Sequence, residues 1–178
     1  ETFTVTLPAP GNATARDGTG AGLVLNDDAL PTVQFGTATS SGAEGATAVA
    51  ISVALSATTG GPVTVDYTVS GGTATNGTDY TFTPGTATIP AGTTSTTVTF
   101  TVTDDTLDEP DETVIITLSN PSGATAGTPG SHTYTILDND VTPEATFATA
   151  SSSASEPSGV ATITTLLSQA SALTVTVP

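Results

Sequence analysis

Acidic side chains supply most of the chemistry that this sequence could perform. Six acids lie between positions 104 and 112, namely Asp104, Asp105, Asp108, Glu109, Asp111 and Glu112. The 178-residue chain holds 17 acids against one Arg, no Lys, one His and no Cys, so its formal charge is −16. Carboxylates without basic neighbours repel each other when a fold gathers them, and carboxylate oxygens are the ligands that hard divalent cations prefer. The sequence therefore offers cation binding, provided that the fold brings the acids together.

The elements that must position these acids are β-strands. Apolar residues alternate with small or polar ones, and Gly- and Pro-rich breaks separate the alternating runs. The runs cover residues 49–55, 63–69, 98–102, 114–118 and 134–136, with shorter strands expected around 32–35 and 86–89. About seven alternating strands in about 110 residues are typical of an antiparallel β-sandwich built from two sheets. No amphipathic helix is expected.

Strand alternation predicts that the acids meet at one pole of the sandwich. Successive strands reverse direction, so alternate connections lie at the same end. Glu44 lies in the first of these connections, Asp79 in the third, and the acids of residues 104–112 in the fifth. Asp138 and Asp140 follow the last strand. Ca²⁺ is the most economical counterion, because it takes about 6–8 oxygen ligands in irregular geometry, whereas Zn²⁺ favours Cys and His. Solvated acidic loops that only aid solubility are the alternative.

The sequence also repeats itself with a period of 111 to 112 residues. The matched segments are Glu1–Leu7 with Glu112–Leu118, Asn26–Asp28 with Asp138–Asp140, and Pro31–Phe35 with Pro143–Phe147. A period of this length is the size of an autonomous domain. We therefore predict the C-terminal part of a first repeat at 1–30, a complete repeat at 31–141, and the N-terminal part of a third repeat at 142–178. The chain would then be a window from a longer head-to-tail array.

Four motifs of the central repeat closely resemble the Calx-beta domain family. They are Gly72-Thr-Ala74, Gly77-Thr-Asp79-Tyr80, the acidic run Asp104–Glu112, and Ile136-Leu-Asp-Asn-Asp140. The resemblance implies an immunoglobulin-like β-sandwich. Some members of the family, notably in sodium–calcium exchangers, bind clustered Ca²⁺ at one pole. Many others occur in tandem in large bacterial surface proteins and adhesins.

The resemblance also implies a set of metal ligands. Carried over by position, the side-chain ligands are Glu44, Asp79, Asp104, Asp105, Glu109, Glu112, Asp138 and Asp140, and Leu107 contributes its carbonyl oxygen. Asp108 and Asp111 are expected to point outward into solvent. Asn139 stands where other members often carry a third acid, which would lower the affinity or the number of ions. In the partial repeats, Glu1, Asp27, Asp28 and Glu156 match acids of the central repeat.

These observations predict a structural, calcium-binding segment of an extended extracellular fibre or adhesin stalk. In this interpretation the protein is secreted or held at the cell surface, and Ca²⁺ rigidifies the junctions between neighbouring repeats, beside the linker 141–143. Two alternatives remain. One is a regulatory Ca²⁺-sensor domain of a membrane protein. The other is a subunit of a filament, assembled laterally or by strand exchange with other copies.

Other classes of function find little support in the sequence. Nucleic acids and anionic membrane surfaces both require Lys and Arg, which this chain almost lacks. No apolar run is long enough to insert into a bilayer. An enzyme is not expected: His132 is predicted on a solvated strand edge, and an aromatic content of 4% provides no platform for a sugar substrate.

Overall fold

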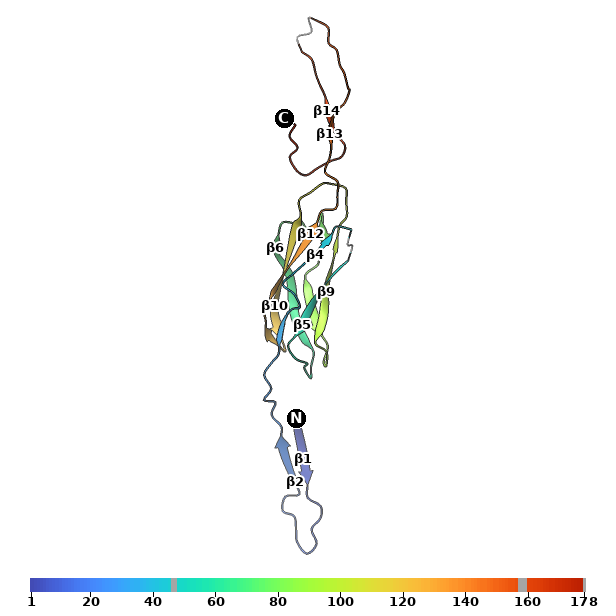
Figure 1. Ribbon diagram of the computed structural model, residues 1–178. Helices are drawn as coiled ribbons and strands as arrows, with labels where there is room; N and C mark the ends of the chain where they lie inside the picture. The colour runs from blue at the N-terminus through green and yellow to red at the C-terminus, as the bar shows by residue number, and fades with distance from the viewer. Residues whose placement is uncertain (46–47, 157–159, 178) are drawn as a thin grey trace. The chain divides into compact units, whose positions relative to one another are not determined.

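The computed structural model describes residues 1–45, 48–156 and 160–177, which form two units, Glu1–Leu30 and Pro31–Pro178. The described residues contain strands β1 to β14 and no helix (Figure 1). Accordingly, no helix among them is long and apolar enough to cross a membrane.

The first unit is a two-stranded antiparallel hairpin. Strand β1 (Thr2–Thr6) pairs with β2 (Thr19–Leu23), and its register runs from Thr2 opposite Leu23 to Thr6 opposite Thr19. Large apolar side chains of this hairpin are exposed, among them Phe3 and Val5. The hairpin therefore has apolar side chains that it does not bury by itself.

The second unit contains a sandwich of two five-stranded sheets. The first sheet has the order β4 (Thr39–Ala43), β12 (Ser131–Leu137), β10 (Glu112–Ser122), β6 (Val63–Gly72) and β8 (Gly85–Ile89). The second has the order β11 (Thr125–Ala126), β3 (Thr32–Phe35), β5 (Val49–Leu55), β9 (Ser95–Val102) and β7 (Tyr80–Thr81). All seven predicted strands are present. The short strands β4, β7 and β11 were not predicted, because none of them shows apolar alternation.

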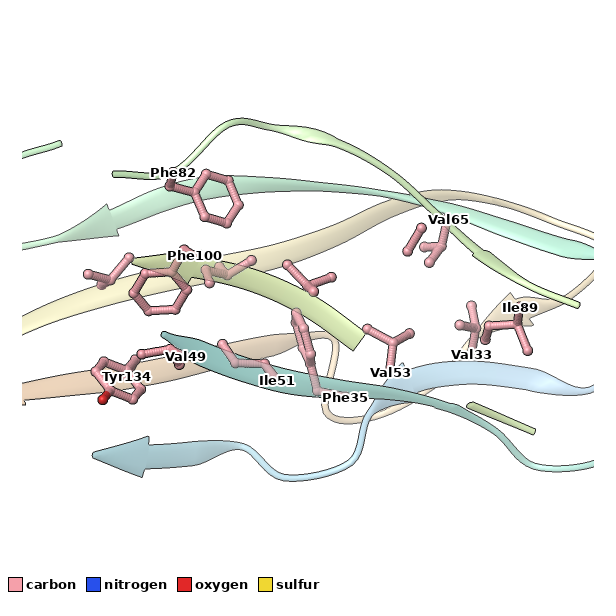
Figure 2. Packing of buried hydrophobic residues seen from close by; sticks show 14 of the residues in the cluster. Val33, Phe35, Val49, Ile51, Val53, Val65, Phe82, Ile89, Phe100 and Tyr134 are labelled. Carbon is pink, nitrogen blue, oxygen red and sulfur yellow. The ribbon is translucent and has the colours of Figure 1, made fainter. Parts of the chain in front are cut away.

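The core forms where the inner faces of the two sheets meet (Figure 2). Along β5 every second residue, from Val49 to Leu55, is buried, as the period of two predicts. Aromatic rings fill the centre, and Phe100 packs edge-to-face on Tyr134 with ring centroids 5.3 Å apart. Full burial of one such apolar side chain contributes about 1.5–3 kcal/mol. This packed core fixes the strand ends, and so it positions the loops that follow them.

His132 corrects one prediction. It is 1% exposed and belongs to the inward face of β12, not to a solvated edge. Its Nδ1 lies 2.8 Å from the carbonyl oxygen of Thr37, and its Nε2 lies 2.8 Å from Ser40 Oγ. A carbonyl oxygen can only accept, so Nδ1 donates to Thr37, and both ring nitrogens of His132 have hydrogen-bond partners. The prediction was wrong because β4, which carries Ser40, covers the edge of β12 as an unforeseen parallel strand.

A glycine fixes the connection that leaves β6. Gly72 has a φ of +123°, and a Cβ atom there would overlap the carbonyl group of Thr113. The next two amides, of Thr73 and Ala74, donate to this same carbonyl at 2.9 and 3.1 Å. The close approach ties the start of the loop 73–79 to β10, and this loop carries Asp79.

The C-terminal part of the second unit contains a short antiparallel pair, β13 (Ala145–Phe147) and β14 (Thr165–Leu167). Ala145 lies opposite Leu167, and Phe147 lies opposite Thr165. Phe147 and Leu167 are exposed. As in the first hairpin, apolar side chains of this pair lack a sheet to cover them.

Candidate metal centre

Three carboxylates meet where β4 and β12 end side by side. We call Glu44, Asp138 and Asp140 the first acidic group: one oxygen of each lies within 4.8 Å of the others. Strands β4 and β12 are parallel, with Ala43 opposite Leu137, so the residues that follow them emerge together. The amide of Glu44 donates to the carbonyl of Leu137 at 3.2 Å. The register of the sheet therefore positions this group.

Three further carboxylates form the second acidic group, Asp79, Glu109 and Glu112, with the same 4.8 Å limit between their oxygens. Glu112 begins β10, Asp79 directly precedes β7, and Glu109 lies in the acidic loop. Asp79 Oδ2 accepts from the amide of Thr75 at 2.5 Å. This group depends on loop geometry more than the first one does.

The remaining predicted ligands lie in the loop between β9 and β10. Asp105 Oδ1 accepts from the amide of Leu107 at 2.7 Å, and Asp104 Oδ1 accepts from Asn139 Nδ2 at 3.2 Å. Both aspartates are exposed, and Leu107 is half-buried. Neither aspartate belongs to a three-carboxylate group, but the charge of Asp105 helps to raise the pKa of Glu44. The structure therefore places Asp104 and Asp105 near the first group, and the carbonyl of Leu107 as a ligand stays a prediction.

The first acidic group contains buried oxygens without partners. Glu44 Oε2, Asp138 Oδ1 and Asp140 Oδ2 are buried and accept no hydrogen bond from the described residues. Glu44 as a whole is 6% exposed. A buried carboxylate oxygen without a donor is costly unless a proton or a cation compensates its charge. The group thus offers the oxygen ligands of a cation site, and its uncompensated negative charge favours a bound cation.

Burial and mutual repulsion raise the pKa values of these acids. The pKa of Glu44 rises from 4.5 to about 7, first because of burial and then because of the charges of Asp105 and Asp138. The pKa of Glu112 also rises to about 7, through burial and then its hydrogen bond with Asp79. Burial is the main cause of the raised pKa values of Glu109 and Asp140. Without a cation, the site therefore tends to retain protons near neutral pH.

Two acids of the loop had been expected to face solvent, and only one does. Asp108 is 6% exposed, and its Oδ2 accepts the hydroxyl of Ser171 at 2.6 Å, so the prediction for this residue was wrong. This contact could not be predicted from local pattern, since Ser171 lies 63 positions away. Asp111 is exposed as predicted, yet its Oδ1 accepts from the amide of Asp138 at 3.1 Å. Asp111 and Asn139 thus support the site without having been predicted to do so.

A mainly antiparallel β-sandwich with carboxylates clustered beyond its strand ends belongs to the class of cation-binding β-sandwich domains. The sequence model of the Calx-beta domain matches residues 26–140, and the chain belongs to this family. The predicted family and the immunoglobulin-like fold are thereby confirmed. The family is not a catalytic one. No curated protein sequence matches the chain.

Solved structures agree with this assignment. The apo-form Calx CBD1 domain has 28% identity and a TM-score of 0.59, with 63% of this chain and all of that chain covered. The calcium binding domain CBD12 of CALX1.1 has 29% identity and a TM-score of 0.58, and the match covers 61% of this chain and 44% of that one. The Calx CBD2 domain, at 14% identity and a TM-score of 0.57, shares the fold. This chain thus spans less than half of the CBD12 structure.

Proposed function

We propose that the acidic pole of the central domain binds Ca²⁺. The two acidic groups hold the metal, and Asp104, Asp105 and the carbonyl of Leu107 complete the coordination. One observation carries the proposal: buried carboxylate oxygens of Glu44, Asp138 and Asp140 converge without hydrogen-bond partners. A cation between them removes the cost of leaving these charges unpaired.

The donor set favours Ca²⁺ over other metals. All the candidate ligands are oxygen atoms, and the six carboxylates of the two groups can provide the many contacts that Ca²⁺ takes. Mg²⁺ prefers a tighter octahedron and keeps several waters, and Zn²⁺ sites use Cys and His ligands, which neither acidic group contains. The similar domain of CALX1.1 is itself described as a calcium binding domain.

We further propose that the central domain is one repeat of an extended, extracellular array. Strand register supports this proposal. Phe3 lies opposite Gly22 in the first hairpin, and the residues 111 and 112 positions later, Val114 and Tyr134, lie opposite each other in the central domain. The same correspondence holds at every pair of β1 and β2. The first hairpin therefore has the register of β10 and β12, as expected for the corresponding strands of a preceding domain.

The C-terminal strand pair, β13 and β14, likewise keeps the register of two strands of the central domain. Phe147 lies opposite Thr165, and 112 residues earlier Phe35 lies opposite Val53. Phe35 is completely buried, whereas Phe147 is exposed. The pair β13 and β14 thus has the register of β3 and β5, as expected for the first strands of a following domain, whose other strands would cover Phe147. Ca²⁺ bound beside the linker 141–143 then stiffens the junction between repeats, which suits a fibre or adhesin stalk in calcium-rich extracellular fluid.

A regulatory Ca²⁺ sensor is the second candidate, and one observation favours it. The similar CBD12 structure of CALX1.1 is described as a calcium binding domain and matches this chain at 29% identity over 44% of its own length. Small-angle scattering of the full chain with Ca²⁺ and with a chelator distinguishes the two roles. A stalk becomes more extended and less flexible with Ca²⁺, because its junctions stiffen, and identical dimensions in the two conditions would refute this role; a sensor changes its dimensions without extending. Concentration-dependent growth in particle size would instead indicate a filament of several copies.

Calorimetric titration of the full chain with CaCl₂ and MgCl₂ tests the binding itself. We expect Ca²⁺ to bind more tightly than Mg²⁺, and Glu44→Gln to weaken Ca²⁺ at least about tenfold, because the site loses a charged ligand. Asp66→Asn is a matched control. It removes one charge from a carboxylate that accepts from Thr86 and Asn120 on the strands, away from both acidic groups. Equal effects of the two substitutions, or no Ca²⁺ binding in the wild type, would refute the proposed site.

A further inference from the structure

Asp108 is the acid of the β9–β10 loop that contacts a different part of the chain. Its Oδ2 accepts the hydroxyl of Ser171 at 2.6 Å, and the same hydroxyl lies 3.2 Å from the carbonyl oxygen of Asp108. The amide of Ala172 donates to that carbonyl at 3.0 Å. Asp108 and Ser171 thereby form an isolated parallel β-bridge. Both the side chain and the backbone of Asp108 contribute to the contact.

The partner segment belongs to the region that we assign to the following repeat. Ser171 lies 112 residues after Thr59, which lies in the turn between β5 and β6 of the central domain. Both positions carry a hydroxyl group. Thr59 Oγ1 donates within its own turn, to the carbonyl of Gly61 at 2.6 Å, whereas Ser171 donates to a carboxylate. The segment of the following repeat that corresponds to this turn thus contacts the acidic loop.

Further hydrogen bonds hold the partner segment in place. The amide of Leu173 donates to Ser171 Oγ at 3.1 Å, and the amide of Ser168 donates to the carbonyl of Glu144 at 2.9 Å. Gln169 Nε2 donates to the carbonyl of Val141, which lies in the linker. The hydroxyl of Ser171 therefore reaches Asp108 from a segment that is fixed on both sides.

We propose that Asp108 is a positioning residue that joins the metal-bearing loop to the following repeat. The surface consists of the carboxylate and the carbonyl of Asp108, and its partner is the hydroxyl-bearing turn around Ser171. A hydrogen bond from a hydroxyl to a buried carboxylate is charge-assisted, and removal of the donor leaves the charge without compensation. Asp108 thus acts in the junction and not as a metal ligand.

The contact also couples the junction between repeats to the metal site. This coupling rests on the proposed function, because it requires Ca²⁺ to bind the acidic loop. The candidate ligands Asp105 and Glu109 lie three residues before and one residue after Asp108 in the same loop. A cation that fixes these neighbours also fixes the loop that presents Asp108. By thermodynamic linkage, docking of the following repeat then strengthens Ca²⁺ binding by the same factor as Ca²⁺ strengthens docking.

Hydrogen exchange of the Ala172 amide in the full chain tests the contact, because this amide donates to Asp108. We expect Ser171→Ala to accelerate the exchange about tenfold in the presence of a chelator, since a charge-assisted hydrogen bond is lost. Ser171→Thr keeps the hydroxyl and should restore slow exchange. Thr59→Ala is the matched control, one repeat earlier, and should leave Ala172 unchanged. An unchanged exchange rate in Ser171→Ala overturns the proposal.

The same measurement with Ca²⁺ separates this proposal from the proposed function. In the wild type we expect Ca²⁺ to slow exchange at Ala172, and in Ser171→Ala we expect this response to shrink. If calorimetry shows Ca²⁺ binding but Ala172 does not respond, the linkage is refuted while the metal site stands. If calorimetry shows no Ca²⁺ binding, the metal site fails, and the comparison of wild type with Ser171→Ala in chelator still decides the Asp108 contact.

Discussion

The two acidic groups each bring three carboxylates within 4.8 Å of one another, but their charges are compensated differently. In the first group, sheet register brings Glu44 beside Asp138, and buried oxygens are left without donors. In the second group, Asp79 accepts an amide hydrogen and shares a hydrogen bond with Glu112. The first group is therefore preorganised for a cation, whereas in the second group a hydrogen bond between Asp79 and Glu112 already compensates part of the charge. The comparison predicts that the first group contributes more of the Ca²⁺ affinity.

The largest expected effect is on Ca²⁺-dependent thermal stability. At a Ca²⁺ concentration of about 100 times Kd, binding stabilises the folded state by about 2.7 kcal/mol, so Tm should rise by several degrees. We expect Asp138→Asn to abolish most of this rise and Glu109→Gln to abolish less, because Asp138, unlike Glu109, carries an oxygen that is buried without a donor. Calorimetric scans with Ca²⁺ and with a chelator measure both effects. A larger loss in Glu109→Gln would reverse the proposed order of the two groups.

A smaller effect is expected from pH in the absence of metal. The folded-state pKa of Glu44 is about 7 against an ordinary value of 4.5, so the folded protein binds more protons between these values. The free energy of unfolding should therefore fall as pH rises from about 4.5 to about 7, by on the order of 1 kcal/mol for this residue. Urea unfolding at several pH values, in the presence of a chelator, measures this slope.

Glu44→Gln provides the control for the pH experiment, because glutamine keeps the shape and cannot titrate. The slope should become shallower in this variant, and part of it should remain because Glu112 also has a pKa of about 7. Saturating Ca²⁺ should remove the decline, since the cation favours the charged carboxylates. Stability that rises with pH over this range in chelator would contradict the assignment of retained protons to the acidic groups.

The smallest expected effect concerns Asn139, which lies between two ligands of the first group and donates to Asp104 at 3.2 Å. Asn139→Asp replaces this donor with another carboxylate. Without metal, we expect the variant to be destabilised by about 1 kcal/mol through repulsion from Asp104. With metal, we expect Ca²⁺ affinity to rise a few fold. Calorimetric titration and urea unfolding measure the two changes, and unchanged affinity would show that the first group does not extend to position 139.

Much of the site could be predicted because local pattern and strand alternation together determine it. The alternation of residues such as Val49 and Ile51 gives the strands, and the direction of each strand assigns Glu44, Asp79 and Asp138 to one pole. The division of the acids into two groups could not be predicted. It depends on the parallel pairing of β4 with β12, and the residues of β4, Thr-Ser-Ser-Gly-Ala, have no apolar pattern that would reveal a strand.

The sequence by itself determined the strand pattern, the family, and the set of acids that could hold a metal, because period-two hydrophobicity and carboxylate chemistry are local properties. Only the tertiary structure decided which of these acids are partners. It buried His132 under β4 and turned Asp108 toward Ser171, 63 residues further along the chain. These outcomes depend on contacts between distant segments, whose energies come from burial and hydrogen bonding that no local pattern specifies.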